Sequence, residues 1–402
     1  MLELDCGAAF DIAQDKDFFS AVPPRPAVCL IELRDPSAER LLIRTQDLQR
    51  RLQRLLGPPD PASKRLNLRE VASGVRYRVT GSRFEQVFAY YLQAKELFPK
   101  RYQDMLRIRP PAVLKVSLRN AYPRCYVTRR IPVDEAGLPT AGAYYGPFAS
   151  RRSAEAFAGS ALDFFKVRRC QIKIRRDPTF PGCMYSEMKM CLAPCFAGCS
   201  KEDYDAEVQR LVQFLDTSGG SLCNSLEHER EGASDALDFE RAAFLHKKIE
   251  KLDDALRGSP ELPRRIQDLS AVILQRSAEE QTVGVYAVRG GWLAAPTFVR
   301  FAEIAGQPRS AEHIFREYLE GATTQPLENS RAKAAAAGGN KSVLSEHLWL
   351  LARWYYSNPR EGEIFFREKD WPYRRIMRGC SRLLAPKPEA DSGSASTPAP
   401  AR

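Results

Sequence analysis

Histidine is scarce in this sequence, and long apolar runs are missing from it. The histidines are scattered without the spacing of metal ligands, and three of them fall within helical patterns, so we expect them to be surface or packing residues. No apolar stretch approaches the roughly 18 residues that a membrane-spanning helix requires. The sequence therefore predicts neither a histidine metal site nor a membrane association. The histidines are His228, His246, His313 and His347.

A secretory signal is also missing from the start of the sequence. The first residues, MLELDCGAAFDIAQDKDFF, include acidic side chains where a signal peptide would have a basic patch followed by an apolar stretch. We therefore expect a cytoplasmic protein. The ten cysteines should not pair as disulfides in that reducing compartment, which leaves metal binding, catalysis or packing as their roles.

The composition is that of a globular protein, with 44% hydrophobic and 28% charged residues. A chain of 402 residues exceeds one ordinary core, and its strand and helix patterns, which have no fixed repeat, predict an α+β multidomain fold. Residues 328–342 are rich in Ala and Gly and are expected to be disordered. The expected units are a small α/β domain (20–150), a helix with a cysteine-rich segment (151–199), a helical domain (200–258), a second small α+β unit (259–385) and a disordered tail (386–402).

The net charge of +11 is concentrated in one part of the chain. Residues 95–176 contain 18 lysines and arginines but only 6 aspartates and glutamates, whereas residues 200–257 contain 8 and 14. A local excess of positive charge favours polyanions, because binding releases their counterions. We therefore expect the basic region to contact a nucleic acid. The candidate residues are Arg129, Arg130, Arg151, Arg152, Lys166, Arg168 and Arg169.

Half of the cysteines fall within one stretch of 30 residues. Cys170, Cys183, Cys191 and Cys195 follow the spacing C-x12-C-x7-C-x3-C, and Cys199 comes four residues later. Clustered thiolates can close a tetrahedral metal site, and so dense a group is not expected from unrelated thiols. Structural zinc sites usually have two tight cysteine pairs, whereas this spacing has one. The spacing therefore favours an iron–sulfur cluster, with zinc as the alternative.

A second pattern lies in the segment LDFERAAFLHKKIEKLDDAL. Leu245, Ile249, Leu252 and Leu256 form one apolar stripe on a helix, and Asp238 is placed to cap its N-terminus. Periodicity alone favours an amphipathic helix that packs on its own protein. The same stripe could also bind a helical partner.

Three segments resemble the UvrC family. KVRRCQIKIRRDPTFPGCMYSEMKMCLAPCFAG resembles the cysteine-rich segment of UvrC proteins, and AYYGPFASRRSAEAF is similar to their YFGP segment. Asp238-Phe239-Glu240 followed by Ala242-Ala243 resembles the UVR motif that UvrC shares with UvrB. The resemblance implies a four-iron four-sulfur cluster on the first four cysteines of the stretch, with Cys199 outside it, and no bound nucleotide.

The same resemblance implies a protein partner. Residues 200–257 would form a helical hairpin that docks on the corresponding hairpin of UvrB. The partner-binding residues carried over from the family are Asp238, Phe239, Glu240, Ala242, Ala243, Leu245, Ile249 and Leu252.

Residues 22–131 are similar in layout to the GIY-YIG nuclease domain of that family. Such a nuclease uses two tyrosines, an arginine and a glutamate that holds a divalent metal. At the matching positions, Cys29 and Leu41 replace the tyrosines, Ile43 replaces a glycine, and Tyr90 stands at or near the glutamate. The basic residue is kept as Arg51. These replacements argue against catalysis by a domain that we expect to be a degenerate GIY-YIG fold.

The family also has a second nuclease domain, which is RNase H-like. Residues 268–320 resemble only the region that leads into this domain. We therefore predict a UvrC-like excision-repair protein that binds UvrB and DNA without nuclease activity of its own. Two alternatives stay open. One is an active excinuclease subunit that uses Arg51 with displaced residues such as Glu85 or Tyr91, and the other is an iron–sulfur redox sensor or adaptor.

Overall fold

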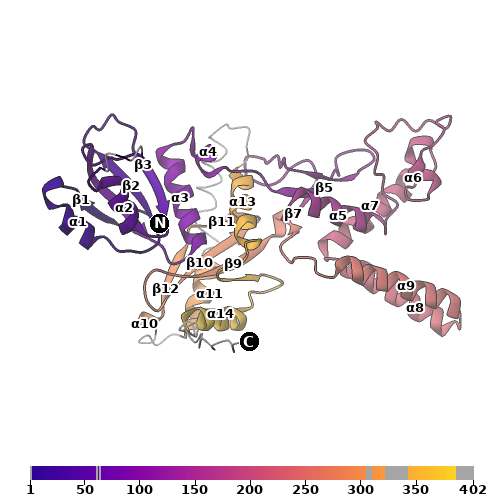
Figure 1. Cartoon of the computed structure of the whole chain (residues 1–402). Helices are drawn as coiled ribbons and strands as arrows, with labels where there is room; N and C mark the ends of the chain where they lie inside the picture. The colour runs from indigo at the N-terminus through magenta and orange to yellow at the C-terminus, as the bar shows by residue number, and fades with distance from the viewer. Residues whose placement is uncertain (1, 60–61, 63–64, 305–309, 322–342, 386–402) are drawn as a thin grey trace, which may run out of the picture.

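The computed structural model describes residues 2–59, 62, 65–304, 310–321 and 343–385. Residues 328–342 and the tail 386–402, for which the sequence predicts disorder, lie outside this described part. The described residues form three antiparallel sheets with helices packed on them (Figure 1). The expected α+β class is therefore confirmed. Among the described helices, none combines the length and the apolar character needed to cross a membrane.

The first sheet separates two apolar layers. Its strand order is β1-β4-β2-β3. Neighbouring residues of a strand point to opposite faces, so Cys29 and Ile31 pack with α1 and α2, whereas Val28 and Leu30 pack with α3. The elements are β1 (Cys6–Ala9), η1 (Ile12–Gln14), α1 (Asp15–Ala21), β2 (Ala27–Leu33), β3 (Leu41–Thr45), α2 (Leu48–Leu56), β4 (Ala72–Val79), α3 (Arg83–Leu97) and α4 (Tyr102–Leu106).

The second sheet has the order β6-β5-β7-β8 and shares one core with α5, α7 and a pair of long helices, α8 and α9. The strands expected in one domain over residues 20–150 thus lie in two different sheets. In Figure 1 the helix pair projects away from the rest of the molecule. The elements are β5 (Ala112–Val116), β6 (Cys125–Thr128), β7 (Ala143–Phe148), α5 (Arg151–Leu162), α6 (Met184–Glu187), η2 (Pro194–Phe196), α7 (Lys201–Asp216), α8 (Gly220–Asp235), α9 (Phe239–Leu256) and β8 (Arg264–Arg265).

The third sheet has the order β11-β10-β9-β13, with β12 also paired to β10. Gly290 and Gly291 form the turn between β10 and β11 with φ angles of 55° and 80°, which suit a tight hairpin. One face packs on α11 and α14, and the other on α13 and α3. The elements are η3 (Ile266–Asp268), β9 (Ser270–Arg276), β10 (Thr282–Arg289), β11 (Trp292–Leu293), β12 (Thr297–Arg300), α10 (Phe301–Ile304), α11 (Ala311–Gly321), α13 (Val343–Tyr355), β13 (Glu363–Phe366) and α14 (Tyr373–Leu384).

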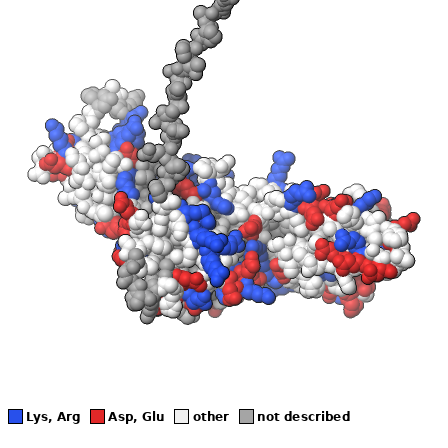
Figure 2. Space-filling model, turned by 90° about the horizontal axis from the view of Figure 1, so that it is seen from below, with Lys and Arg blue, Asp and Glu red and all other residues white. Residues whose placement is uncertain are grey.

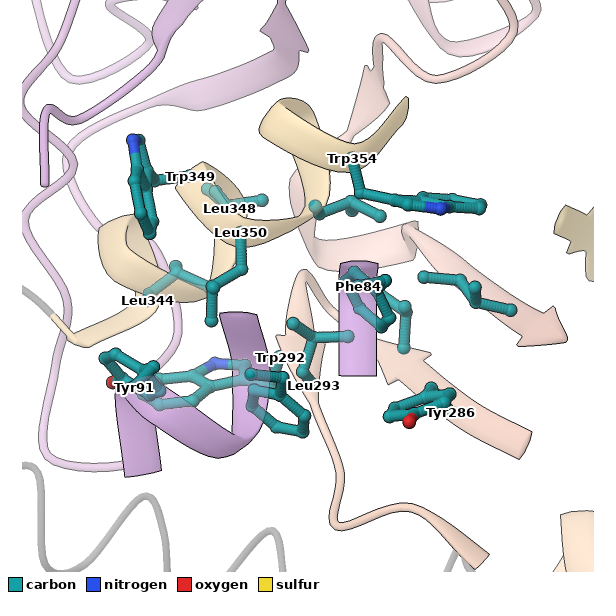
Figure 3. Close-up of a cluster of buried hydrophobic side chains, with 14 of the residues drawn as sticks. Phe84, Tyr91, Tyr286, Trp292, Leu293, Leu344, Leu348, Trp349, Leu350 and Trp354 are labelled. Atoms are coloured by element: carbon teal, nitrogen blue, oxygen red, sulfur yellow. The ribbon is translucent and has the colours of Figure 1, made fainter. Parts of the chain in front are cut away.

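The first and third sheets share a single core, although they are far apart in the sequence. Phe84 and Tyr91 of α3 lie against Tyr286 and Trp292 of the third sheet, and Leu348 of α13 packs on the same cluster (Figure 3). Large apolar side chains of this kind each contribute about 2 kcal/mol or more when they are fully buried. The N-terminal and C-terminal parts of the chain are therefore joined by a continuous apolar interface.

Candidate functional site

The positions that match the nuclease tyrosines lie in an apolar layer. Cys29 on β2 is completely buried, Ile43 stands opposite it on β3, and Leu41 is half-buried on the same face. Phe18 of α1 and Leu52 of α2 complete this core. Burial raises the pKa of the Cys29 thiol to about 12, so it stays protonated at neutral pH and is a poor nucleophile. Apolar side chains thus occupy the face where the family resemblance places the reacting groups.

Tyr90, which matches the glutamate position, lies on the opposite face of the same sheet. Its side chain is buried in the layer beneath α3, and its hydroxyl donates a hydrogen bond of 3.4 Å to the carbonyl oxygen of Leu42. The sheet itself separates this layer from the one that contains Cys29. The structure therefore does not bring the four degenerate positions into one site.

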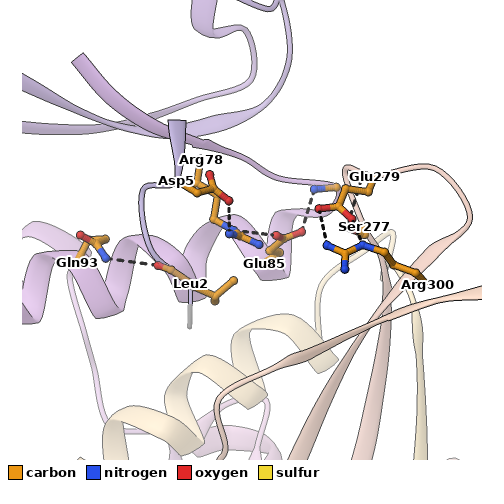
Figure 4. Close-up of polar contacts among 9 residues, drawn as sticks. Leu2, Asp5, Arg78, Glu85, Gln93, Ser277, Glu279 and Arg300 are labelled. Carbon is orange, nitrogen blue, oxygen red and sulfur yellow. Dashed lines mark hydrogen bonds and ion pairs between the residues drawn. The ribbon is translucent and has the colours of Figure 1, made fainter. Parts of the chain in front are cut away.

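The alternative of an active nuclease requires Arg51 with Glu85 or Tyr91, and these residues form other contacts or lie apart. Glu85 is buried at the start of α3, where its carboxylate accepts a backbone N–H at 2.9 Å and lies 3.5 Å from the Arg78 guanidinium (Figure 4). Burial raises the pKa of Glu85 in spite of these partners. Tyr91 donates to the buried carboxylate of Glu346. Arg51 lies on α2, across the sheet from the helix that carries Glu85 and Tyr91, so the three do not share a site.

A buried arginine organises the start of the cysteine-rich segment. Arg168 is 6% exposed, and its guanidinium donates to the carbonyl oxygens of Tyr122 at 2.9 Å, Ile172 at 2.9 Å and Cys170 at 3.4 Å. Its backbone N–H donates to the Tyr204 hydroxyl at 3.1 Å. This placement corrects the expectation that Arg168 contacts DNA, because the side chain is buried and its Nε and Nη1 groups donate to backbone carbonyls.

The four clustered thiols lie within electrostatic reach of one another. Burial raises the pKa of Cys191 to about 11, and the charges of Cys170, Cys195 and Cys183 contribute to the increase. Hydrogen bonding opposes it, since the backbone N–H of Ala193 donates to the Cys191 sulfur at 3.3 Å. The folded segment thus brings four cysteine side chains into one neighbourhood. Within the described residues, no group of three or more His, Cys, Asp and Glu side chains is placed to hold a single metal ion.

The helical hairpin consists of α8 and α9, whereas α7, which the sequence assigned to the hairpin, packs on the second sheet. The Asp238 carboxylate caps α9 as predicted, accepting a backbone N–H at 3.0 Å. Leu245, Ile249 and Leu252 are 4%, 7% and 0% exposed because they are buried in the same core as apolar residues of α8. This corrects the expectation that they dock on UvrB, since they stabilise the hairpin itself.

Three other large apolar side chains are exposed near the turn of this hairpin. Leu237, Phe239 and Phe244 are 72%, 67% and 66% exposed. Leu237 also has a φ of 59°, a left-handed conformation that is unfavourable for a residue with a branched side chain. The family motif includes Phe239, but the sequence pattern does not indicate Leu237 or Phe244, because both lie off the helical stripe. Of the other motif residues, Asp238, Glu240 and Ala243 are exposed and Ala242 is half-buried.

Two of the arginines expected to contact DNA line one hollow. Arg129 and Arg151 face a surface hollow of about 370 Å³ together with Arg109 and Arg353. Arg353 comes from α13, far from the basic region of the sequence, so charge counting missed it. The other predicted contacts do not line this hollow: Arg130, Arg152 and Lys166 are exposed outside it, and Arg169 forms an ion pair of 2.8 Å with Asp163.

The face viewed from below has a separate charge pattern. Basic side chains form a band near the middle of the molecule, while acidic side chains gather along the projecting arm (Figure 2). On α14, Arg375, Arg378 and Arg382 line a hollow of about 350 Å³ together with Glu363, which pairs with Arg382. The charge of this surface is therefore partly compensated.

Comparison with known proteins indicates the family of the chain. Residues 112–214 match the UvrC/Cho excinuclease middle domain. The chain is a member of the UvrC family. The UvrABC system protein C of Ruminiclostridium cellulolyticum is 29% identical over 180 residues, which make up 44% of this chain and 28% of that protein. The corresponding values are 32% over 185 residues for the Gemmatimonas aurantiaca protein, covering 45% and 29%, and 25% over 281 residues for the Dehalococcoides mccartyi protein, covering 68% and 44%.

The match to the UvrC middle domain covers the middle part of the chain. The matched middle domain contains β5 to β7, α5, the cysteine-rich segment and α7. The first sheet and the α8–α9 hairpin lie outside it. In these comparisons the chain spans less than half the length of the UvrC proteins it matches. No solved structure matches this UvrC-family chain. The family is thus confirmed, and the cluster and the partners stay predictions.

Proposed function

We propose that this UvrC-family protein binds a UvrB-type partner and DNA in nucleotide excision repair, and that its N-terminal domain does not cut DNA. The observation that carries the proposal is the distribution of apolar residues on the hairpin. The inner stripe of α9 is buried against α8, while Leu237, Phe239 and Phe244 stay in solvent near the turn. Neighbouring exposed aromatic and aliphatic side chains, rimmed by charged residues, are typical of a protein-binding surface.

The noncatalytic part of the proposal is supported by the layers of the first sheet. The two positions that match the nuclease tyrosines are occupied by Cys29 and Leu41 in an apolar core, and Tyr90 lies across the sheet from them. Phosphodiester hydrolysis by this kind of nuclease needs a carboxylate to hold a divalent metal. Glu85, the buried carboxylate of α3, is instead held by Arg78 and a backbone N–H.

We also infer that Cys170, Cys183, Cys191 and Cys195 hold a four-iron four-sulfur cluster, with Cys199 outside it. A bound cluster would supply a covalent cross-link among four points of a segment that has few buried apolar side chains of its own. Arg168 and Tyr204 position the first of these points through hydrogen bonds to the backbone. The cluster would thereby fix the hairpin relative to the second sheet.

The test combines a binding assay with an incision assay on the full chain. Purified protein is mixed with UvrB, and binding is measured by size-exclusion chromatography. Incision of a duplex with one bulky adduct is then measured with the remaining components of a UvrABC system, using an active UvrC protein as the positive control. The proposal predicts a complex with UvrB and no strand cleavage. Metal-dependent cleavage that requires this protein would contradict the noncatalytic part, and the absence of a complex would contradict the partner.

A further inference from the structure

A second hollow lies where the first sheet meets the C-terminal part of the chain. It has a volume of about 450 Å³ and lies between the end of β3, the start of α3 and the end of α13. Arg44, Arg83 and Arg353 line it, one from each of these three elements, and all three are exposed. The hollow is thus a place where three cationic side chains from distant parts of the sequence converge.

The charges in this hollow are poorly compensated. Partial burial lowers the pKa of the Arg44 guanidinium, and the positive charges of Arg353 and Arg83 add to the decrease, so Arg44 lies within electrostatic reach of both. Within the described part of the chain, none of the three forms an ion pair with a carboxylate. Glu361 also lines the hollow, but its carboxylate accepts the backbone N–H of Arg83 at 2.8 Å. The hollow therefore has an excess of positive charge that an anion would neutralise.

This hollow adjoins the one that contains Arg129 and Arg151, because Arg353 lines both. The Arg353 guanidinium lies 5.5 Å from the centre of the Trp349 ring, a cation–π contact with a side chain that lines the hollow of Arg129 and Arg151. A single phosphate or a free nucleotide would occupy one hollow. A ligand with repeated negative charges could occupy both and contact arginines on each side of α13.

The floor of the new hollow is buried and offers no ring to a base. Phe84 and Trp354 line it but are only 3% and 6% exposed. Stacking of bases requires accessible aromatic faces, whereas arginine side chains bind the phosphates of any sequence. The lining therefore favours the backbone of a nucleic acid over its bases.

We propose that a nucleic-acid strand crosses α13 at Arg353, with its phosphates in both hollows and Arg44 and Arg83 as contacts on the far side. The proposal depends on the proposed function only in taking DNA as the physiological ligand. It adds a path for the strand and three contact residues, Arg44, Arg83 and Arg353, which lie outside the basic region of the sequence (residues 95–176). The N-terminal domain would then contact DNA at the edge where α3 meets α13, away from its filled former catalytic face.

The test measures binding of the full chain to fluorescein-labelled single-stranded and duplex oligonucleotides by fluorescence anisotropy over a series of salt concentrations. Arg353→Gln and the double variant Arg44→Gln/Arg83→Gln should each weaken binding roughly three- to tenfold at low salt and reduce the salt dependence by about one ion per lost contact. Arg353→Lys should keep most of the affinity, because it keeps the charge. Arg50→Gln is the matched control, since Arg50 is an exposed arginine of α2 outside both hollows.

Three results would overturn the proposal. The first is wild-type affinity in both Arg353→Gln and the double variant. The second is a loss of affinity in Arg353→Gln with none in the double variant, which would confine the ligand to the other hollow. The third is displacement of the oligonucleotide by millimolar ATP but not by ATP-free buffer of equal ionic strength, which would indicate a site for free nucleotides. UvrB binding by the same variants is measured in parallel, so a failure of the partner proposal is distinguishable from a failure of this one.

Discussion

The hydroxyl group of Tyr91 on α3 donates a hydrogen bond of 2.7 Å to Oε2 of Glu346 on α13, which lies 255 residues later in the chain. Tyr102 and Gln103 each donate to the other oxygen at 2.6 Å, and the Lys95 ammonium lies 3.3 Å from Oε2. Glu346 is 2% exposed. A buried carboxylate with this many donors holds the N-terminal and C-terminal parts of the chain in one relative position.

Glu346→Ala should therefore destabilise the folded chain strongly. The substitution leaves two tyrosine hydroxyls without their acceptor and removes the carboxylate partner of the Lys95 ammonium, and we expect the free energy of unfolding to fall by about 3 kcal/mol. Glu346→Gln should cost less, because its amide oxygen still accepts. Urea unfolding followed by circular dichroism measures both, with Asp254→Asn, in an exposed pair with Arg257, as the control. Equal stability of Glu346→Ala and the wild type would contradict the role of this carboxylate.

His347 should make stability depend on pH between about 6.5 and 3. Burial lowers the pKa of His347 from 6.5 to about 3, and the charge of Lys95 adds to the decrease. Nδ1 accepts the backbone N–H of Leu293 at 2.9 Å, so the folded state holds the neutral ring. Below pH 6.5 the unfolded chain binds a proton that the folded chain excludes, so the stabilisation is complete above this pH and falls by up to about 1.4 kcal/mol per pH unit below it.

Urea unfolding at pH 7.5 and pH 5.5 tests this dependence. The window lies above the range where most carboxylates titrate, which isolates the histidine contribution. His347→Gln should lower stability at both pH values but should lose most of the difference between them. The explanation would be abandoned if the variant kept the full difference.

Removal of single cysteines should separate cluster ligands from bystanders. We expect Cys191→Ala and Cys195→Ala to abolish the broad visible absorbance of anaerobically purified protein and its bound iron, because a four-iron cluster needs all four thiolates. Cys199→Ala and Cys125→Ala should keep both, and Cys125 serves as the control because it is a buried thiol of β6. Stoichiometric zinc with no iron in the wild-type protein would contradict the iron–sulfur cluster and support zinc as the bound metal.

Substitutions on the hairpin should separate partner binding from stability. Phe239→Ala and Phe244→Ala remove exposed side chains, so we expect at least tenfold weaker UvrB binding with a change in stability within about 0.5 kcal/mol. Leu252→Ala creates a cavity in the hairpin core and should cost about 2 to 5 kcal/mol. Isothermal titration with UvrB and thermal unfolding measure the two effects. Undiminished UvrB binding by the Phe239→Ala/Phe244→Ala double variant would rule out this surface.

The hairpin illustrates what periodicity can predict. The helix of α9, its cap at Asp238 and its apolar stripe all follow from the sequence, because they depend on residues within one or two turns of each other. Periodicity identifies an apolar face but does not say what covers that face. In the structure α8 covers it, so the residues left for a partner, Leu237 and Phe244 among them, lie outside the stripe.

The sequence by itself determined the features that depend on local spacing and composition: the α+β class, the dense group of cysteines, the capped amphipathic helix and the membership in the UvrC family. Tertiary structure alone decided which residues share a layer or a hollow. Cys29 and Tyr90 fall on opposite faces of one sheet, and Arg353 joins arginines more than 200 positions earlier in the chain. Such contacts arise from the packing of whole sheets and helices, and no property of neighbouring residues specifies them.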